Sequence, residues 1–86
     1  MVIFISTNQG FKELETVIIS GSYPIWVGAG VLTEEEITAL RKKGIELTDF
    51  NYSINPKIPE ELDDALETIR EHHPGQRIWA EYQPKI

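Results

Sequence analysis

The run Val2-Ile3-Phe4-Ile5 decides the fold class, because four consecutive β-branched and aromatic residues leave no polar side for water. A run of this kind is typical of a strand buried on both faces, as in a parallel sheet that helices cover from both sides. Turn-forming residues at 6–10 end this strand. Further strands are predicted at residues 25–27, 45–50 and 76–83.

Apolar residues at helical spacing separate these strands. The clearest helix begins at Thr33, a typical N-cap with which Glu36 completes a capping box, and it ends at Gly44. Another helix begins at Pro59 and runs to His73. Its apolar stripe consists of Leu62, Ala65, Leu66 and Ile69.

Residues 11–20 allow two interpretations. Phe11, Leu14 and Ile18 fall at helical spacing, which favours a helix. The β-branched residues 17–19 also suit a strand, which would give an α+β fold with an antiparallel hairpin. We expect the helix. The order is then β-α-β-α-β-α-β, and the chain, residues 1–86, forms a single α/β domain: a small three-layer sheet of about four mainly parallel strands.

Composition excludes several classes of function. The 86 residues include 14 acidic and 8 basic side chains, which gives a net charge of −6. This charge argues against direct binding of nucleic acid, which needs basic residues to neutralise phosphates. The absence of cysteine excludes disulfides, cysteine metal sites and a thiol nucleophile. No apolar run is long enough for a membrane span, and the first residues lack the basic start of a signal peptide, so we expect a cytoplasmic protein.

Polar residues at the predicted strand ends are the candidates for a ligand or catalytic site. Ligands of open parallel sheets bind beyond the carboxyl ends of the strands. Asp49 and Glu81 are acids that could serve as a base there, and Ser6 is a further catalytic candidate. The candidate ligand-binding residues are Thr7, Asn8, Gly28, Gly30 and Asn51.

Neither a cofactor nor a metal is expected. Gly28-Ala29-Gly30 lies between a strand and a helix, but the third glycine of a dinucleotide loop is missing, and the acidic residues 34–36 would repel a phosphate. His72 and His73 lack the spacing of metal ligands and are expected to sit at a helix C-terminus, where a cation is favoured.

Two features indicate contacts with other proteins. The helix 59–73 has six acidic residues and a single arginine, so it is either a solvated face or a docking surface for a basic partner. Trp79 shares its strand face with Arg77 and Glu81, and it either packs in the core or anchors an interface. The candidate interface residues are Trp79, Asp63, Asp64, Glu67 and Glu71.

These observations favour a small acidic module without catalytic activity, which binds or regulates through protein–protein contacts and associates with itself as a homodimer. One alternative is a small-ligand-binding protein or hydrolase-like enzyme that uses the strand-end residues. Such a site requires those side chains to converge on one pocket. The other alternative is an acidic inhibitor of a protein that handles nucleic acid.

Overall fold

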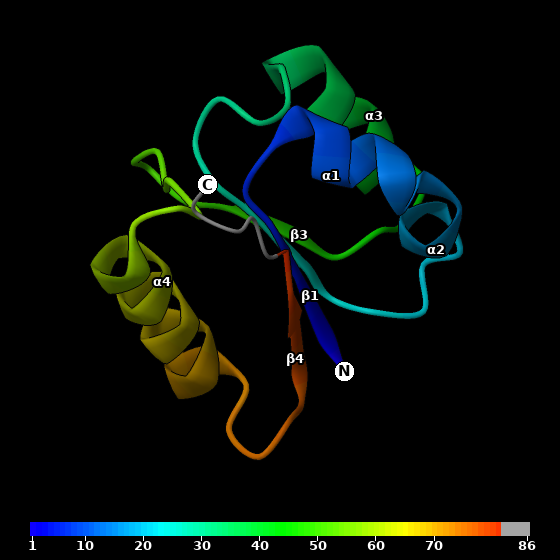
Figure 1. Ribbon diagram of the computed structural model, residues 1–86. Helices are drawn as coiled ribbons and strands as arrows, with labels where there is room; N and C mark the ends of the chain where they lie inside the picture. The colour runs from blue at the N-terminus through cyan, green and yellow to red at the C-terminus, as the bar shows by residue number, and fades with distance from the viewer. Residues whose placement is uncertain (82–86) are drawn as a thin grey trace.

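The computed structural model describes residues 1–81, which form a four-stranded parallel sheet with helices on both faces (Figure 1). The predicted α/β class is therefore confirmed. The strands are β1 (Val2–Ile5), β2 (Ile25–Val27), β3 (Leu47–Asp49) and β4 (Ile78–Ala80). The helices are α1 (Asn8–Glu13), α2 (Glu15–Ile19), α3 (Glu34–Lys42) and α4 (Pro59–His72).

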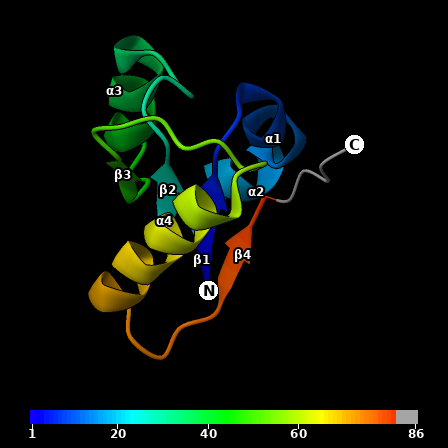
Figure 2. The same cartoon turned by 60° about the vertical axis from the view of Figure 1, so that its left-hand side comes forward.

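The strand order is β3-β2-β1-β4, and every neighbouring pair is parallel. The chain steps from β1 to β2 and β3 in one direction and then returns across the sheet to β4. Crossovers between parallel strands are right-handed, so this reversal of direction puts the last crossover helix on the opposite face. Helices α1, α2 and α3 cover one face and α4 covers the other (Figures 1 and 2).

Alternating side chains of the strands supply two hydrophobic cores. Ile3 and Ile5 of β1 face α1–α3, whereas Val2 and Phe4 face α4. All four side chains are at least 99% buried, as expected for a central strand with both faces covered. Residues of the helices complete the cores: Phe11, Ile18, Ile37 and Leu40 on the first face, and Ala65 and Ile69 on the second.

Residues 11–20 are helical, so the antiparallel hairpin is wrong. Two details differ from the expected helix. It begins three residues earlier, because the Thr7 hydroxyl accepts a hydrogen bond from the Gly10 amide and caps α1. It also bends at Leu14, which has φ −106° and ψ 11° and separates α1 from α2. The Ile18 amide still donates to the Leu14 carbonyl, so the apolar stripe continues across the bend.

The other elements lie where they were predicted: β1 and β2 have the predicted bounds, and β3 and β4 are shorter. The capping box of Thr33 and Glu36 is present at the start of α3, and Gly44 follows its end with φ +86°. Strand β3 is shorter than the predicted 45–50, and β4 is shorter than 76–83. The predicted strand residues 82 and 83 lie outside the described part of the chain. No helix among residues 1–81 has the length and hydropathy required to cross a membrane.

The two tryptophans differ sharply in their environments. Trp26 of β2 is 5% exposed and packs beneath the end of α4, where the rings of His72 and His73 lie 5.3 and 6.0 Å from it. Trp26 is therefore a core residue. Trp79 of β4 is 40% exposed, so of its two predicted roles the core role is wrong. The cause is the strand order, which places β4 at an edge of the sheet.

Candidate functional site

The strand order locates the place where a ligand of this sheet would be expected. Open parallel sheets bind ligands beyond the carboxyl ends of the strands, at the point where the strand order reverses. Here that point lies between β1 and its neighbour β4. The residues that follow these two strands are Ser6 and Thr7 after β1, and Glu81 after β4.

The Glu81 carboxylate occupies this position and is only 7% exposed. Its Oε1 accepts hydrogen bonds from the backbone amides of Ser6 and Thr7, both at 3.0 Å, and from the Ser6 hydroxyl at 3.4 Å. Its Oε2 accepts a hydrogen bond from the Thr7 hydroxyl. We call this set of bonds the Glu81 bridge. It joins the end of β4 to the start of α1 and brings three of the predicted site residues together.

Thr7 has a double role in the bridge. Its hydroxyl donates to Glu81 and accepts from the amide of Gly10 at 3.0 Å, so the group that caps α1 also holds the carboxylate. Amides at the start of a helix lack partners within the helix, and an anion is favoured there. The chain therefore supplies its own anionic group to these amides.

Gly10 explains how the carboxylate comes so close to the helix. A Cβ atom built on Gly10 would lie 2.5 Å from Cδ and 2.9 Å from Oε2 of Glu81, far inside normal contact. Only glycine leaves room for the carboxylate at this point of α1. The turn predicted for residues 6–10 did not indicate this role of Gly10. The signal that could have found it is the spacing of Thr7 and Gly10, which suits an N-cap and the third helical residue.

The candidates after β2 hold the loop that leads into α3. Gly28 and Gly30 belong to a turn closed by the Val31 amide, which donates to the Gly28 carbonyl at 3.3 Å, and Gly30 has φ +80°. A positive φ at the third residue is typical of a type II turn. The Asn8 side chain donates to the Val31 carbonyl at 3.1 Å and ties this loop to α1.

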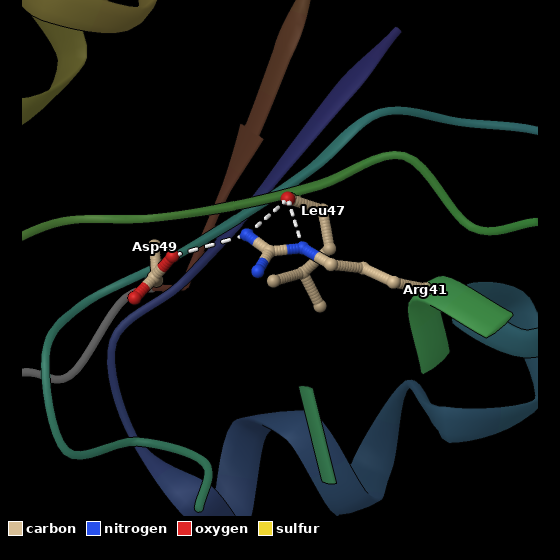
Figure 3. A network of polar contacts seen from close by, with 3 residues as sticks. All are labelled: Arg41, Leu47 and Asp49. Atoms are coloured by element: carbon tan, nitrogen blue, oxygen red, sulfur yellow. Dashed lines mark hydrogen bonds and ion pairs between the residues drawn. The ribbon is translucent and has the colours of Figure 1, made fainter. Parts of the chain in front are cut away.

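The candidates after β3 lie at the far side of the sheet. Asp49 forms an ion pair of 3.1 Å with Arg41, whose Nε and Nη2 also donate to the Leu47 carbonyl at 3.2 and 3.0 Å (Figure 3). Asn51 is exposed in the loop that follows. A surface hollow of about 190 Å³ lies beside this ion pair, lined by Glu34, Ile37, Thr38, Arg41 and Asp49.

The two acidic candidates therefore do not share a site. Asp49 ends β3 and Glu81 follows β4, and these strands form opposite edges of the sheet (Figure 2). Three interstrand spacings of about 4.8 Å place the two edges about 14 Å apart. A reaction that used both carboxylates on one small substrate does not fit this separation. Among residues 1–81, moreover, no three His, Asp or Glu side chains gather as a metal ion would require.

The outer edge of β4 has no strand partner within residues 1–81. The Val2 amide donates to the Arg77 carbonyl, and the Glu81 amide donates to the Phe4 carbonyl. Alternate residues of a parallel strand bond to the same neighbour, so the amides and carbonyls of Ile78 and Ala80 point away from β1. No strand of the described chain pairs with them.

The side chain of Trp79 stands beside this open edge. Ile78 and Ala80 pack on the α4 side, so Trp79 points to the opposite face. The helices on that face connect β1 with β2 and β2 with β3, and none of these connections crosses β4. This explains why a large aromatic side chain is 40% exposed.

The acidic candidates of α4 form an exposed stripe on the side away from the sheet. Asp63, Glu67 and Glu71 follow one another at intervals of four residues, and Asp64 lies beside them. Within residues 1–81, none of these four carboxylates forms an ion pair. Glu61 differs, because its carboxylate accepts the Asn55 amide at 3.0 Å and holds the loop before α4.

Comparisons of the chain with models of protein families, with curated proteins and with solved structures give no significant match.

Proposed function

We propose that this protein is a non-enzymatic interaction module that works through protein–protein contacts, with the outer edge of β4 as its main contact surface. The observation that carries the proposal is the combination of backbone groups at Ile78 and Ala80 that have no partner within residues 1–81 with a 40% exposed Trp79 beside them. Exposed edge strands are templates for pairing with another chain, and tryptophan is enriched among the residues that dominate binding energy.

The geometry of the strand ends also supports a binding role over a catalytic one. The lone pairs of Glu81 that face Ser6 and Thr7 are used inside the protein, where they hold β4 to α1. The other acidic candidate, Asp49, is bound to Arg41 at the opposite edge. Both carboxylates thus stabilise the strand that they follow.

A second candidate function rests on the acidic stripe of α4. Its carboxylates, Asp63, Asp64, Glu67 and Glu71, form no ion pair in the described part of the chain and would suit a basic partner, including a protein that handles nucleic acid. Self-association and binding of a basic partner respond to salt in opposite ways. Two copies that each carry a charge of −6 repel one another, so screening by salt strengthens their association, whereas it weakens binding between opposite charges.

Analytical ultracentrifugation at low and high salt tests the proposal. We expect the full chain to self-associate more strongly at high salt. The Trp79→Lys variant should stay monomeric, because it places a charge on the edge strand. Acrylamide quenching of Trp79 should fall as the protein concentration rises, with Trp26 inaccessible throughout.

Monomers at every salt and protein concentration would reject self-association. A complex with polylysine that dissociates in salt and depends on Asp63 and Glu67 would then favour the second function.

A further inference from the structure

We infer that two copies of this chain join by antiparallel pairing of their β4 strands around a two-fold axis at Trp79, which would extend the two sheets into one of eight strands. The inference rests on the proposed function and specifies its partner, which is a second copy of the chain. Homo-oligomers of this kind use the same surface patch on both subunits. The patch must therefore be complementary to itself.

The backbone of β4 is self-complementary in one register. With Trp79 opposite the partner's Trp79, Ile78 lies opposite the partner's Ala80, and these are the residues whose amides and carbonyls point outward. Each such pair exchanges two hydrogen bonds. By symmetry there are four hydrogen bonds, and every outward group of the three-residue strand has a partner.

Hydrogen bonds within the chain disfavour the next register. If Ile78 lay opposite the partner's Ile78, Ala80 would have to pair with the partner's Gln76. The Gln76 amide already donates to the His73 carbonyl at 3.3 Å in the turn before β4. That register would break this bond or leave one outward group of Ala80 without a partner, at the cost of an unsatisfied polar group.

Side chains on the Trp79 face favour the same register. Residues opposite one another in an antiparallel pair project from the same face. The two Trp79 rings, each 40% exposed in one copy, therefore meet at the axis and cover one another. Arg77 lies opposite the partner's Glu81, so residues of opposite charge are neighbours on both sides of the axis. The Glu81 carboxylate is 7% exposed and keeps its bonds to Ser6 and Thr7, so the exposed Arg77 side chain adds a longer-range attraction and not a new ion pair.

The size of this contact sets the expected affinity. Stable complexes bury about 1,200–2,000 Å² in total, and an interface built mainly on one three-residue strand and a tryptophan is smaller. We therefore expect a reversible dimer in the micromolar range, a weak interaction that concentration can switch.

Disulfide trapping tests the register, because the natural sequence contains no cysteine. In a pair without hydrogen bonds, opposite Cα atoms are about 4.5 Å apart, within the range that a disulfide can span. The Trp79→Cys variant should therefore form covalent dimers under mild oxidation at high protein concentration. The Arg77→Cys variant is the control, since residue 77 would lie four residues, about 13 Å, from its copy along the paired strands.

A proline substitution tests the backbone contact. Ala80→Pro removes an outward amide without touching the inward bonds of β4, and it should raise the dissociation constant of the dimer about tenfold or more. Asp49→Pro likewise removes an outward amide of β3, together with the ion pair to Arg41, and it should leave the β4 contact unchanged. Circular dichroism shows whether both variants fold.

The outcomes separate this inference from the proposed function. The pairing is supported if Trp79→Cys forms covalent dimers, Arg77→Cys does not, and Ala80→Pro associates more weakly than the natural chain. A second outcome is that the natural chain dimerises, but disulfides form only when the Trp79→Cys and Arg77→Cys variants are mixed. That result overturns the register and retains β4 as the contact surface. A dimer unaffected by Ala80→Pro overturns the β4 contact itself. A monomer at all concentrations overturns both.

Discussion

The two edges of the sheet are built from strands of equal length, yet a side chain binds an outward backbone group on one edge, and the other edge is more open. On β3, the guanidinium of Arg41 reaches down from α3 and binds the outward carbonyl of Leu47 (Figure 3). On β4, the corresponding outward groups of Ile78 and Ala80 have no partner within residues 1–81, and Trp79 is exposed beside them. An uncovered edge can pair with another chain, and native proteins usually block it. This difference supports the proposed role of β4 as the contact strand.

The edges also differ in how they are held to the rest of the protein. β3 is fixed by the exposed ion pair of Asp49 with Arg41, in which both side chains are about half exposed. β4 is fixed by the buried Glu81 bridge to Ser6 and Thr7. Buried charge-assisted hydrogen bonds contribute more than exposed ion pairs. The more open edge is thus the more firmly anchored one, as the proposed contact strand would require.

The largest effect is expected from Gly10→Ala, which tests how firmly the open edge is anchored. Alanine normally stabilises a helix relative to glycine by roughly 0.5–1 kcal/mol. Here its Cβ would displace the Glu81 carboxylate, and we expect the free energy of unfolding to fall by about 2–3 kcal/mol. Urea denaturation measures this value.

Glu81→Ala provides the control for this prediction. With the carboxylate removed, the added Cβ meets no obstacle, so Gly10→Ala in that background should be neutral or stabilising. Equal losses in both backgrounds would show that the strain at Gly10 has a different source, and the close approach of Glu81 would not matter.

A smaller loss is expected for Thr7→Val, which keeps the shape of the side chain and deletes its hydroxyl. The cap of α1 and one bond of the Glu81 bridge are lost together, so unfolding should become easier by about 1–2 kcal/mol. Thr7→Ser should restore most of the stability. Thermal unfolding of both variants measures this loss of stability. An unchanged melting temperature for Thr7→Val would contradict the double role of this hydroxyl.

The smallest change in stability, about 0.5–1 kcal/mol, is expected for Arg41→Ala, because its ion pair is exposed. The main effect of Arg41→Ala should instead be on the size of the oligomers that the protein forms. With the Leu47 carbonyl uncovered, both edges are open, and copies can join edge to edge in chains that do not close. Light scattering should then show species that grow with concentration. Arg41→Lys keeps the charge but not the two-pronged contact, so it should be intermediate. Dimers alone for Arg41→Ala would show that Arg41 does not protect β3.

Most of the architecture could be predicted from local patterns. The run Val2-Ile3-Phe4-Ile5 indicated a strand with two covered faces, and the capping residues Thr33 and Glu36 marked the start of α3. Such signals act over a few residues and are readable in one sequence. The bend at Leu14 and the short β3 depend on packing against distant elements, so the sequence pattern did not show them.

The arrangement of the candidate site depended on strand order, which the sequence does not reveal. Ser6, Thr7 and Glu81 were predicted to lie near strand ends, and they do. Their direct contact required β1 and β4 to be neighbours, and the separation of Asp49 from Glu81 required β3 to lie at the far edge. Strand order also left Trp79 exposed, although its apolar neighbours suited a core residue equally well.

The Glu81 bridge has a consequence for how the protein folds during its synthesis. Its bonds connect residues that are 74 and 75 positions apart in the sequence, so the ribosome must make residues 1–81 before the first helix receives its carboxylate. The central strand likewise lacks its second neighbour until β4 has been made. We therefore expect this domain to fold in one cooperative step only after residue 81 has left the ribosome.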